Sequence, residues 1–101
     1  MATTKEYRDY IIEQLSLLED ITYKPMMGEY LLYYKGILFG GIYDDRFLVK
    51  RVESNKKYNM EESNPYESAK PMYLVGEEDQ EQIRIIVLDT CKDLKKQHKT
   101  H

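Results

Sequence analysis

Three short apolar runs dominate the middle of the chain and are separated by two tight turns. The runs cover residues 29–34, 37–43 and 46–52, and the turns are Lys35-Gly36 and Asp44-Asp45. Glycine adopts positive φ without steric cost, and Asp tolerates the left-handed region better than most residues. Two-residue loops with these properties join antiparallel strands. The pattern therefore predicts a three-stranded antiparallel meander at the centre of the fold.

Helical periodicity appears on both sides of the meander. Apolar residues at steps of three and four predict a helix over residues 4–18, with the buried stripe Tyr7, Ile11, Leu15 and Leu18. Thr3 and Glu6 have the spacing of a capping box at its start. A second stripe predicts a closing helix capped by Asp79: Ile83, Ile86, Val87, Cys91 and Leu94.

The remaining segments are shorter and more polar. Pro25 prevents the first helix from continuing, so residues 20–27 form either a connection or an irregular edge strand. Residues 53–59 suggest a short helix, 61–69 a polar loop and 71–75 a strand. The resulting order is helix, three-strand meander, short helix, one or two strands, and helix. It predicts a two-layer α+β fold with an antiparallel sheet, in one domain over residues 1–101.

The two turns also set a register for the meander. They place Tyr34 opposite Ile37, Leu32 opposite Phe39, and Gly41 opposite Leu48. Because side chains alternate along a strand, this register gives two apolar faces. One face carries Tyr30, Leu32, Tyr34, Ile37, Phe39, Tyr43 and Leu48, and the other carries Leu31, Tyr33, Leu38, Ile42, Phe47 and Val49. A bulge at Gly40-Gly41 would exchange part of the two faces.

An apolar sheet face without helical cover predicts a contact surface. Two helices cover one side of so small a sheet, and a contiguous apolar patch on a soluble domain usually marks an interface. We expect a protein partner or a second copy of the chain (a homodimer) to bind the sheet through Tyr30, Tyr34, Tyr43 and Leu48. The alternative is that the hydroxyl groups of the ten tyrosines hydrate this face and that nothing binds it.

The charge distribution leaves a second class of partner open. The net charge of −3 argues against a protein that coats nucleic acid by bulk charge. A local basic patch interleaved with aromatic residues is nevertheless present: Arg46, Lys50, Arg51, Lys56 and Lys57. A second basic stretch, residues 92–99, complements the dipole at the end of the closing helix. The patch is either a phosphate-binding surface or a solvated rim that offsets nearby acids.

No constellation of residues in the sequence predicts catalysis. The only histidines, His98 and His101, lie at the end of the chain, and the single cysteine, Cys91, falls on the buried stripe of the closing helix. We therefore predict no catalytic residue, metal site, cofactor or small-molecule ligand, and leave open an enzyme whose site is made only by the fold. One cysteine, no signal-peptide core and no apolar run of transmembrane length predict a cytoplasmic protein.

A spaced pattern of glycines and aromatic residues resembles the N-terminal domain of the TfoX/Sxy family. It comprises Met26-Met27-Gly28-Glu29-Tyr30, Leu32-Tyr33-Tyr34-Lys35-Gly36, Phe39-Gly40, Asp44-Asp45-Arg46-Phe47-Leu48-Val49-Lys50, Pro65-Tyr66 and Ala69-Lys70-Pro71-Met72-Tyr73. The chain departs from the family at Lys24-Pro25-Met26-Met27-Gly28, where relatives often have Arg-Lys-Met-Phe-Gly, and at Leu31, where they often have glycine. Any contact made by those two positions in relatives is therefore altered here.

The resemblance implies a fold and a function class. It implies a two-layer, secretion-chaperone-like α+β fold with five strands, so we expect a further strand within residues 66–76. Full-length relatives regulate natural competence together with the cyclic-AMP receptor protein. The resemblance therefore implies a non-enzymatic domain that acts in transcription regulation by protein–protein contact, without the second domain of the full-length regulators.

Overall fold

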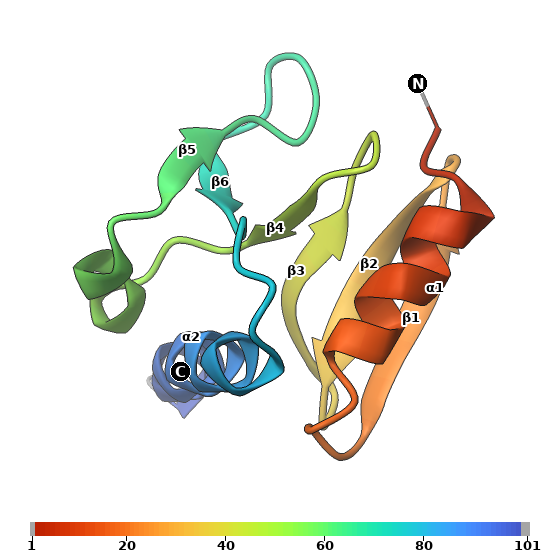
Figure 1. Cartoon of the computed structure of the whole chain (residues 1–101). Helices are drawn as coiled ribbons and strands as arrows, with labels where there is room; N and C mark the ends of the chain where they lie inside the picture. Colours follow the sequence, from red (N-terminus) through yellow and green to blue (C-terminus); the bar gives the residue numbers. More distant parts are fainter. Residues whose placement is uncertain (1, 100–101) are drawn as a thin grey trace.

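One antiparallel sheet of six strands organises the chain in the computed structural model, which describes residues 2–99, with side chains as far as Lys96 (Figure 1). The strands lie in the order β1-β2-β3-β4-β6-β5. Their bounds are β1 Ile21–Met26, β2 Glu29–Tyr34, β3 Ile37–Ile42, β4 Phe47–Val49, β5 Glu61–Ser63 and β6 Met72–Leu74. The helices are α1 (Lys5–Gln14), the 3-10 helix η1 (Glu53–Tyr58) and α2 (Gln80–Lys99). The predicted α+β architecture is confirmed.

The first strand, β1, settles the alternative that the sequence left open for residues 20–27. It pairs with β2 along its whole length and joins it through Met27-Gly28, with φ values of 52° and 86°. Positive φ at both positions is the geometry of a type I′ hairpin turn. Pro25 is tolerated because β1 is an edge strand, where proline is commonly found. The meander therefore has one more strand than predicted.

Both hairpin turns predicted within the meander are present. Tyr34 pairs with Ile37 across the first turn. Tyr43 and Arg46 exchange two backbone hydrogen bonds of 2.9 Å across the second. The four turn residues have φ values between 49° and 81°, so the two aspartates adopt the left-handed conformation beside each other. The sequence signal for these turns was sufficient because it acts within four residues of chain.

A β-bulge in β3 overturns part of the predicted register. Leu32 pairs with Gly40 and not with Phe39, because one extra residue of β3 is inserted at this point. A Cβ atom at position 40 would lie 2.2 Å from the carbonyl oxygen of Leu48 on β4. The close approach of the two strands therefore requires glycine, as is typical where backbones pack tightly within a sheet.

The bulge exchanges the faces of the sheet beyond it. Ile42, Phe47 and Val49 lie in the hydrophobic core with Leu32 and Phe39, and not on the face of Leu31, Tyr33 and Leu38 where the predicted register placed them. Tyr43 and Leu48, which that register placed on one face with Tyr30 and Leu32, lie on the opposite face. The grouping of these five residues with the first half of the meander was therefore wrong, because a single inserted residue inverts the alternation of every side chain after it.

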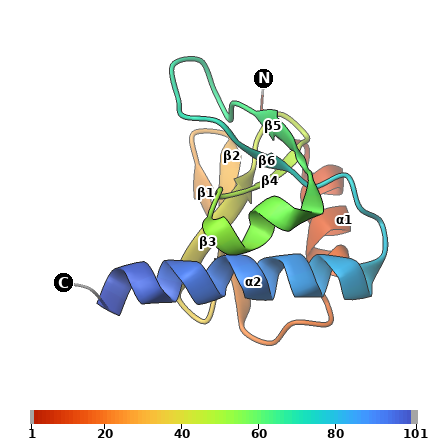
Figure 2. The same cartoon turned by 90° about the vertical axis from the view of Figure 1, so that its left-hand side faces the viewer.

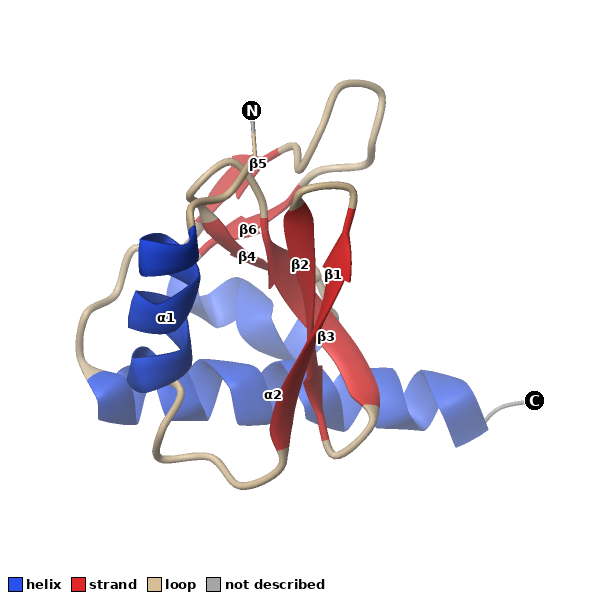
Figure 3. Cartoon of the chain, turned by 90° about the vertical axis from the view of Figure 1, so that its right-hand side faces the viewer, coloured by secondary structure: helices blue, strands red, loops and turns tan. Residues whose placement is uncertain are grey.

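Both helices cover the same face of the sheet, as predicted. One core cluster joins residues of α1, the sheet and α2: Ile11, Leu15, Leu32, Phe39, Ile42, Phe47, Val49, Val75, Ile83, Ile86, Val87 and Cys91. α2 runs across the sheet, and its C-terminal end extends past the strands, as seen from opposite sides in Figures 2 and 3. The strands therefore do not cover the whole length of α2.

The first helix begins and ends differently from its prediction. Thr4 is the N-cap, and its hydroxyl accepts a hydrogen bond from the N–H of Tyr7 at 3.1 Å. Thr3 is buried and donates through its hydroxyl to Glu29 Oε1 of β2 at 2.6 Å. The helix is shorter than residues 4–18, so Leu15 reaches the core from the turn that follows it.

The segment between the meander and α2 forms the other edge of the sheet. The predicted short helix is η1, and the strand predicted at 71–75 is β6. The further strand is β5, at residues 61–63, and not within 66–76 as expected. Its sequence, Glu-Glu-Ser, lacks apolar alternation because its side chains are exposed or half-exposed at the edge of the sheet.

Candidate functional site

The four residues predicted to form one partner surface are divided between the two sides of the sheet. Tyr30 and Tyr34 pack against the helix-covered core. Tyr43 is only 6% exposed and Leu48 is fully buried, both on the other side. The prediction of one exposed surface made by these four residues is therefore wrong, and the bulge in β3 is the physical reason.

A loop of the chain itself covers the sheet next to Tyr43. The rings of Tyr43 and Tyr66 lie 6.4 Å apart between centroids. The guanidinium group of Arg46 donates to the carbonyl oxygens of Asn64 and Pro65, at 2.9 and 3.2 Å, and holds the loop in place. Pro65 is buried. This loop, residues 64–71, covers the sheet at Tyr43, on the side that was predicted to be open.

Away from this loop, the same side of the sheet retains half-exposed apolar side chains. Leu31, Tyr33 and Leu38 alternate with Leu32 and Tyr34, which face the core, so they point to the opposite side of β2 and β3. We call these three residues the open sheet face. It is smaller than the predicted surface, but it has the predicted character: apolar, and not covered by either helix.

The predicted basic patch is held largely by contacts within the domain. Arg46 fastens the 64–71 loop, and Lys50 is half-buried beside that loop. The other three residues form ion pairs with N–O distances between 2.8 and 3.2 Å: Arg51 with Glu62, Lys56 with Glu53 and Lys57 with Asp89. This arrangement favours the interpretation of the patch as a basic rim that offsets neighbouring acids.

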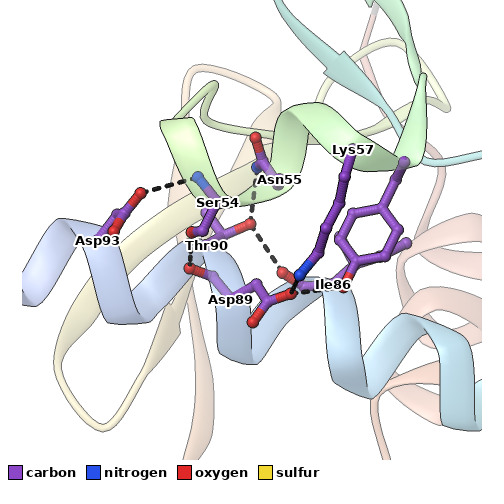
Figure 4. A network of polar contacts seen from close by, with 8 residues as sticks. Ser54, Asn55, Lys57, Ile86, Asp89, Thr90 and Asp93 are labelled. Carbon is purple, nitrogen blue, oxygen red and sulfur yellow. Dashed lines mark hydrogen bonds and ion pairs between the residues drawn. The ribbon is translucent and has the colours of Figure 1, made fainter.

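A cluster of polar side chains joins η1 to α2, and it centres on a buried asparagine (Figure 4). Asn55 is fully buried, and its amide nitrogen donates to Thr90 Oγ1 at 2.8 Å and to the carbonyl oxygen of Lys50 at 2.9 Å. Its amide oxygen accepts from the N–H of Val52 at 3.1 Å. Thr90 in turn donates to the carbonyl oxygen of Ile86 at 2.8 Å.

Two carboxylates of α2 complete this cluster. Asp93 accepts a hydrogen bond from the backbone N–H of Ser54 at 2.8 Å. Hydrogen bonding from Ser54 lowers the pKa of Asp93. Asp89 accepts from the hydroxyl of Tyr58 and pairs with Lys57 at 3.2 Å. Burial, together with the bond to Asp89, raises the pKa of Tyr58 to about 12.

The hydrogen-bonding pattern shows what this cluster does. Each buried polar side-chain atom of the described residues has a hydrogen-bond partner. Fully satisfied polar networks fix one packing arrangement. The cluster is therefore a lock that fastens η1 onto α2. The contact between Asn55 and Thr90 was not predicted, because the two residues are 35 positions apart and their spacing carries no signal.

The structure gives little support for chemistry at the remaining titratable groups. Burial raises the pKa of the Cys91 thiol to about 12, so its reactive thiolate is suppressed. The described part of the chain has no cluster of three or more His, Cys, Asp and Glu residues that could hold a metal ion. The side chains of His98 and His101 lie outside the part of the chain whose side chains the structure describes. Among the described helices none is long and apolar enough to span a membrane.

A shallow groove lies between α2 and the β2–β3 turn, and its volume is about 390 Å³. Tyr34, Ile37, Leu88 and Cys91 line it with apolar surface, and Lys35, Lys92 and Lys95 supply the charged part of its lining. We call it the lysine-rimmed groove. Lys92 and Lys95 belong to the second basic stretch predicted from the sequence, at the end of the closing helix. Their spacing from Leu88 and Cys91, at three to four residues, places all four on one helix face.

Comparison with known protein families identifies a match over most of the chain. The sequence model of the TfoX N-terminal domain matches residues 13–85, from the end of α1 to the first part of α2. No curated protein sequence matches the chain.

Proposed function

Because the chain belongs to the TfoX N-terminal domain family, we propose that it is a regulatory interaction domain that acts by binding another protein. The family is associated with the regulation of competence. In this proposal the domain contributes contacts only, with no catalysis and no cofactor. The polar lock between η1 and α2 is consistent with this role, because its buried groups are all used within the fold.

The open sheet face is the observation that carries the proposal. Leu31, Tyr33 and Leu38 lie side by side on β2 and β3, half-exposed, on the side away from both helices. Tyrosine and aliphatic side chains of this kind form the energetically dominant centres of protein interfaces. The face also explains why both sides of a small sheet are apolar when the helices cover only one of them.

The cyclic-AMP receptor protein, the partner implied for full-length relatives, is the first partner to test. Binding of the immobilised domain to this purified protein, with cyclic AMP present, is measured by biolayer interferometry. We expect Tyr33→Arg to weaken binding by about thirtyfold, which corresponds to about 2 kcal/mol for an aromatic residue at the centre of an interface.

A matched tyrosine elsewhere serves as the control. Tyr10 is 44% exposed on α1, away from the open sheet face, so Tyr10→Arg is expected to bind like the wild-type chain. Equal loss of binding in both variants would assign the effect to charge and not to the open sheet face. If the domain does not bind the receptor protein, capture from nuclease-treated lysate with the same two variants tests for another partner.

Direct binding to nucleic acid and self-association are the two alternatives that these experiments separate. Loss of the captured material after nuclease treatment would transfer the proposal to nucleic acid. Sedimentation equilibrium at micromolar concentration detects a homodimer, and a dimer that Tyr33→Arg dissociates would identify a second copy as the occupant of the open sheet face. A strict monomer that captures no protein would refute the proposal.

A further inference from the structure

We infer that the lysine-rimmed groove is a second binding site, and that it takes an acidic amphipathic segment of a partner protein. The groove is formed by α2 and the β2–β3 turn, whereas the open sheet face lies on the opposite side of the sheet from α2. The inference goes beyond the proposed function, because the site, the residues and the chemistry of the ligand are all different.

The floor of the groove requires apolar groups from the ligand. Tyr34, Ile37 and Leu88 are half-buried there, and Cys91 closes the bottom as a buried neutral thiol. The volume of about 390 Å³ is at the small end of ligand pockets, which span about 300–1,000 Å³. The groove therefore has room for a few apolar side chains of a peptide lying across it.

The charged part of the lining requires negative charge beside those apolar groups. Lys35, Lys92 and Lys95 are exposed, and within the described residues none of their ammonium groups forms an ion pair. Lys35 lies over the ring of Tyr34, with Nζ 5.5 Å from its centroid. The nearest acid along the helix, Asp93, is engaged by Ser54 of η1. The lysines are thus available to carboxylates of a ligand.

The spacing of the charges fits a helical peptide. Lys92 and Lys95 are three residues apart on α2, so they lie about 5–6 Å apart between Cβ atoms, the same separation as two carboxylates one turn apart on a partner helix. An amphipathic helix lying in an apolar groove is a recurrent mode of peptide recognition. The groove lies along α2 between Leu88 and Lys95, so a partner helix in it would run beside α2.

A nucleic acid satisfies only half of these requirements. It supplies phosphates for the three lysines, but it has no aliphatic side chains to cover Ile37 and Leu88, which would remain exposed to water. The net charge of −3 also opposes a polyanion that extends beyond the groove, whereas a short segment meets only the local positive charge. These considerations favour the acidic amphipathic peptide.

The test uses a fluorescein-labelled helical peptide with leucines on one face and glutamates on the flanks. Fluorescence anisotropy with the full chain is expected to show binding that weakens as salt is added, because exposed ion pairs are screened. Two control peptides, one with lysines in place of the glutamates and one with serines in place of the leucines, are expected not to bind. Equal binding of the lysine peptide would overturn the inference.

Charge reversal on the protein tests the site itself. The double variant Lys92→Glu, Lys95→Glu is expected to weaken peptide binding about tenfold. Lys96→Glu changes the same charge on the same helix outside the groove and is expected to bind normally. Lys35→Glu, on the β2–β3 turn, gives an independent loss if the double variant fails to fold by circular dichroism.

Three outcomes decide against the groove as a peptide site. The first is unchanged peptide binding in both groove variants, the double variant and Lys35→Glu. The second is tighter binding of a mixed-sequence DNA duplex than of the peptide, with DNA binding lost in the double variant. The third is a homodimer that the double variant dissociates. Tyr33→Arg is expected to retain peptide binding. The experiments can therefore refute the groove as a binding site without refuting the open sheet face, and the reverse is also true.

Discussion

The buried amide of Asn55 gives the sharpest test of how this fold is held together. Asn55→Ala removes two donated hydrogen bonds and one accepted hydrogen bond, at distances between 2.8 and 3.1 Å. The residue is fully buried, so water does not replace these bonds without opening the contact between η1 and α2. Thr90 keeps its own bond to Ile86, so the loss is confined to the three bonds of the amide.

The expected cost follows from those three bonds. A hydrogen bond within a protein contributes about 1 kcal/mol net, so their removal costs about 3 kcal/mol of unfolding free energy. The higher helix propensity of alanine offsets roughly a few tenths of a kcal/mol of this loss of stability. A domain of about 100 residues loses roughly 4–8 °C of melting temperature per kcal/mol, so we expect a decrease of about 12–24 °C.

Urea unfolding followed by far-UV circular dichroism measures this loss, because the chain has no tryptophan to report by fluorescence. A lower midpoint with an unchanged slope identifies a change in stability. Asn64→Ala is the matched control: Asn64 is exposed and makes one side-chain hydrogen bond, to the carbonyl oxygen of Ala69. Its expected cost is less than about 1 kcal/mol. Equal costs for the two variants would refute the account of Asn55 as the centre of the lock.

Three further outcomes are expected from the same reasoning. Gly40→Ala places a Cβ 2.2 Å from the Leu48 carbonyl oxygen, and we expect a loss of about 3 kcal/mol or more in urea unfolding. Gly76→Ala meets nothing within 4 Å, so a cost as large there would contradict the steric argument. Cys91, with its pKa raised to about 12, is expected to resist a thiol reagent until the chain unfolds. Because its folded pKa lies above its unfolded value, the stability that the neutral thiol contributes is present below about pH 8.5 and is lost as pH rises toward 12. Arg46→Ala is expected to speed proteolysis within residues 64–71, since the guanidinium group holds that loop; unchanged cleavage would show that Tyr66 and Pro65 suffice.

Local signals in the sequence predicted most of the elements. The turns at Lys35-Gly36 and Asp44-Asp45 and the stripe of α2 depend on residues a few positions apart, so they could be identified without the fold. The missed turn at Met27-Gly28 has the same signal as Lys35-Gly36. Its strand was left open because Pro25 weakened the pattern, although proline is compatible with an edge strand.

The contact surfaces were harder to predict than the elements. Tyr43 and Leu48 left the predicted surface because one inserted residue in β3 inverted the faces after it. The lysine-rimmed groove was not predicted, because Tyr34 and Ile37 meet Leu88 and Cys91 only through the packing of α2 on β3. Arg46 was predicted as a candidate phosphate ligand, but its guanidinium group donates to carbonyl oxygens of the 64–71 loop, which has no signal in the sequence around Arg46.

Local patterns in the chain are enough to identify the class of fold, the family and the apolar character of both sides of the sheet. These properties follow from periodicity, turn residues and composition, which act over a few positions of the chain. Three other properties come from the packing of distant segments: which apolar residues stay accessible, which cations are already paired, and which residues meet across the groove. Those outcomes depend on the bulge at Gly40, on the 64–71 loop and on the placement of α2, because contacts between distant segments have no signature in the spacing of either segment.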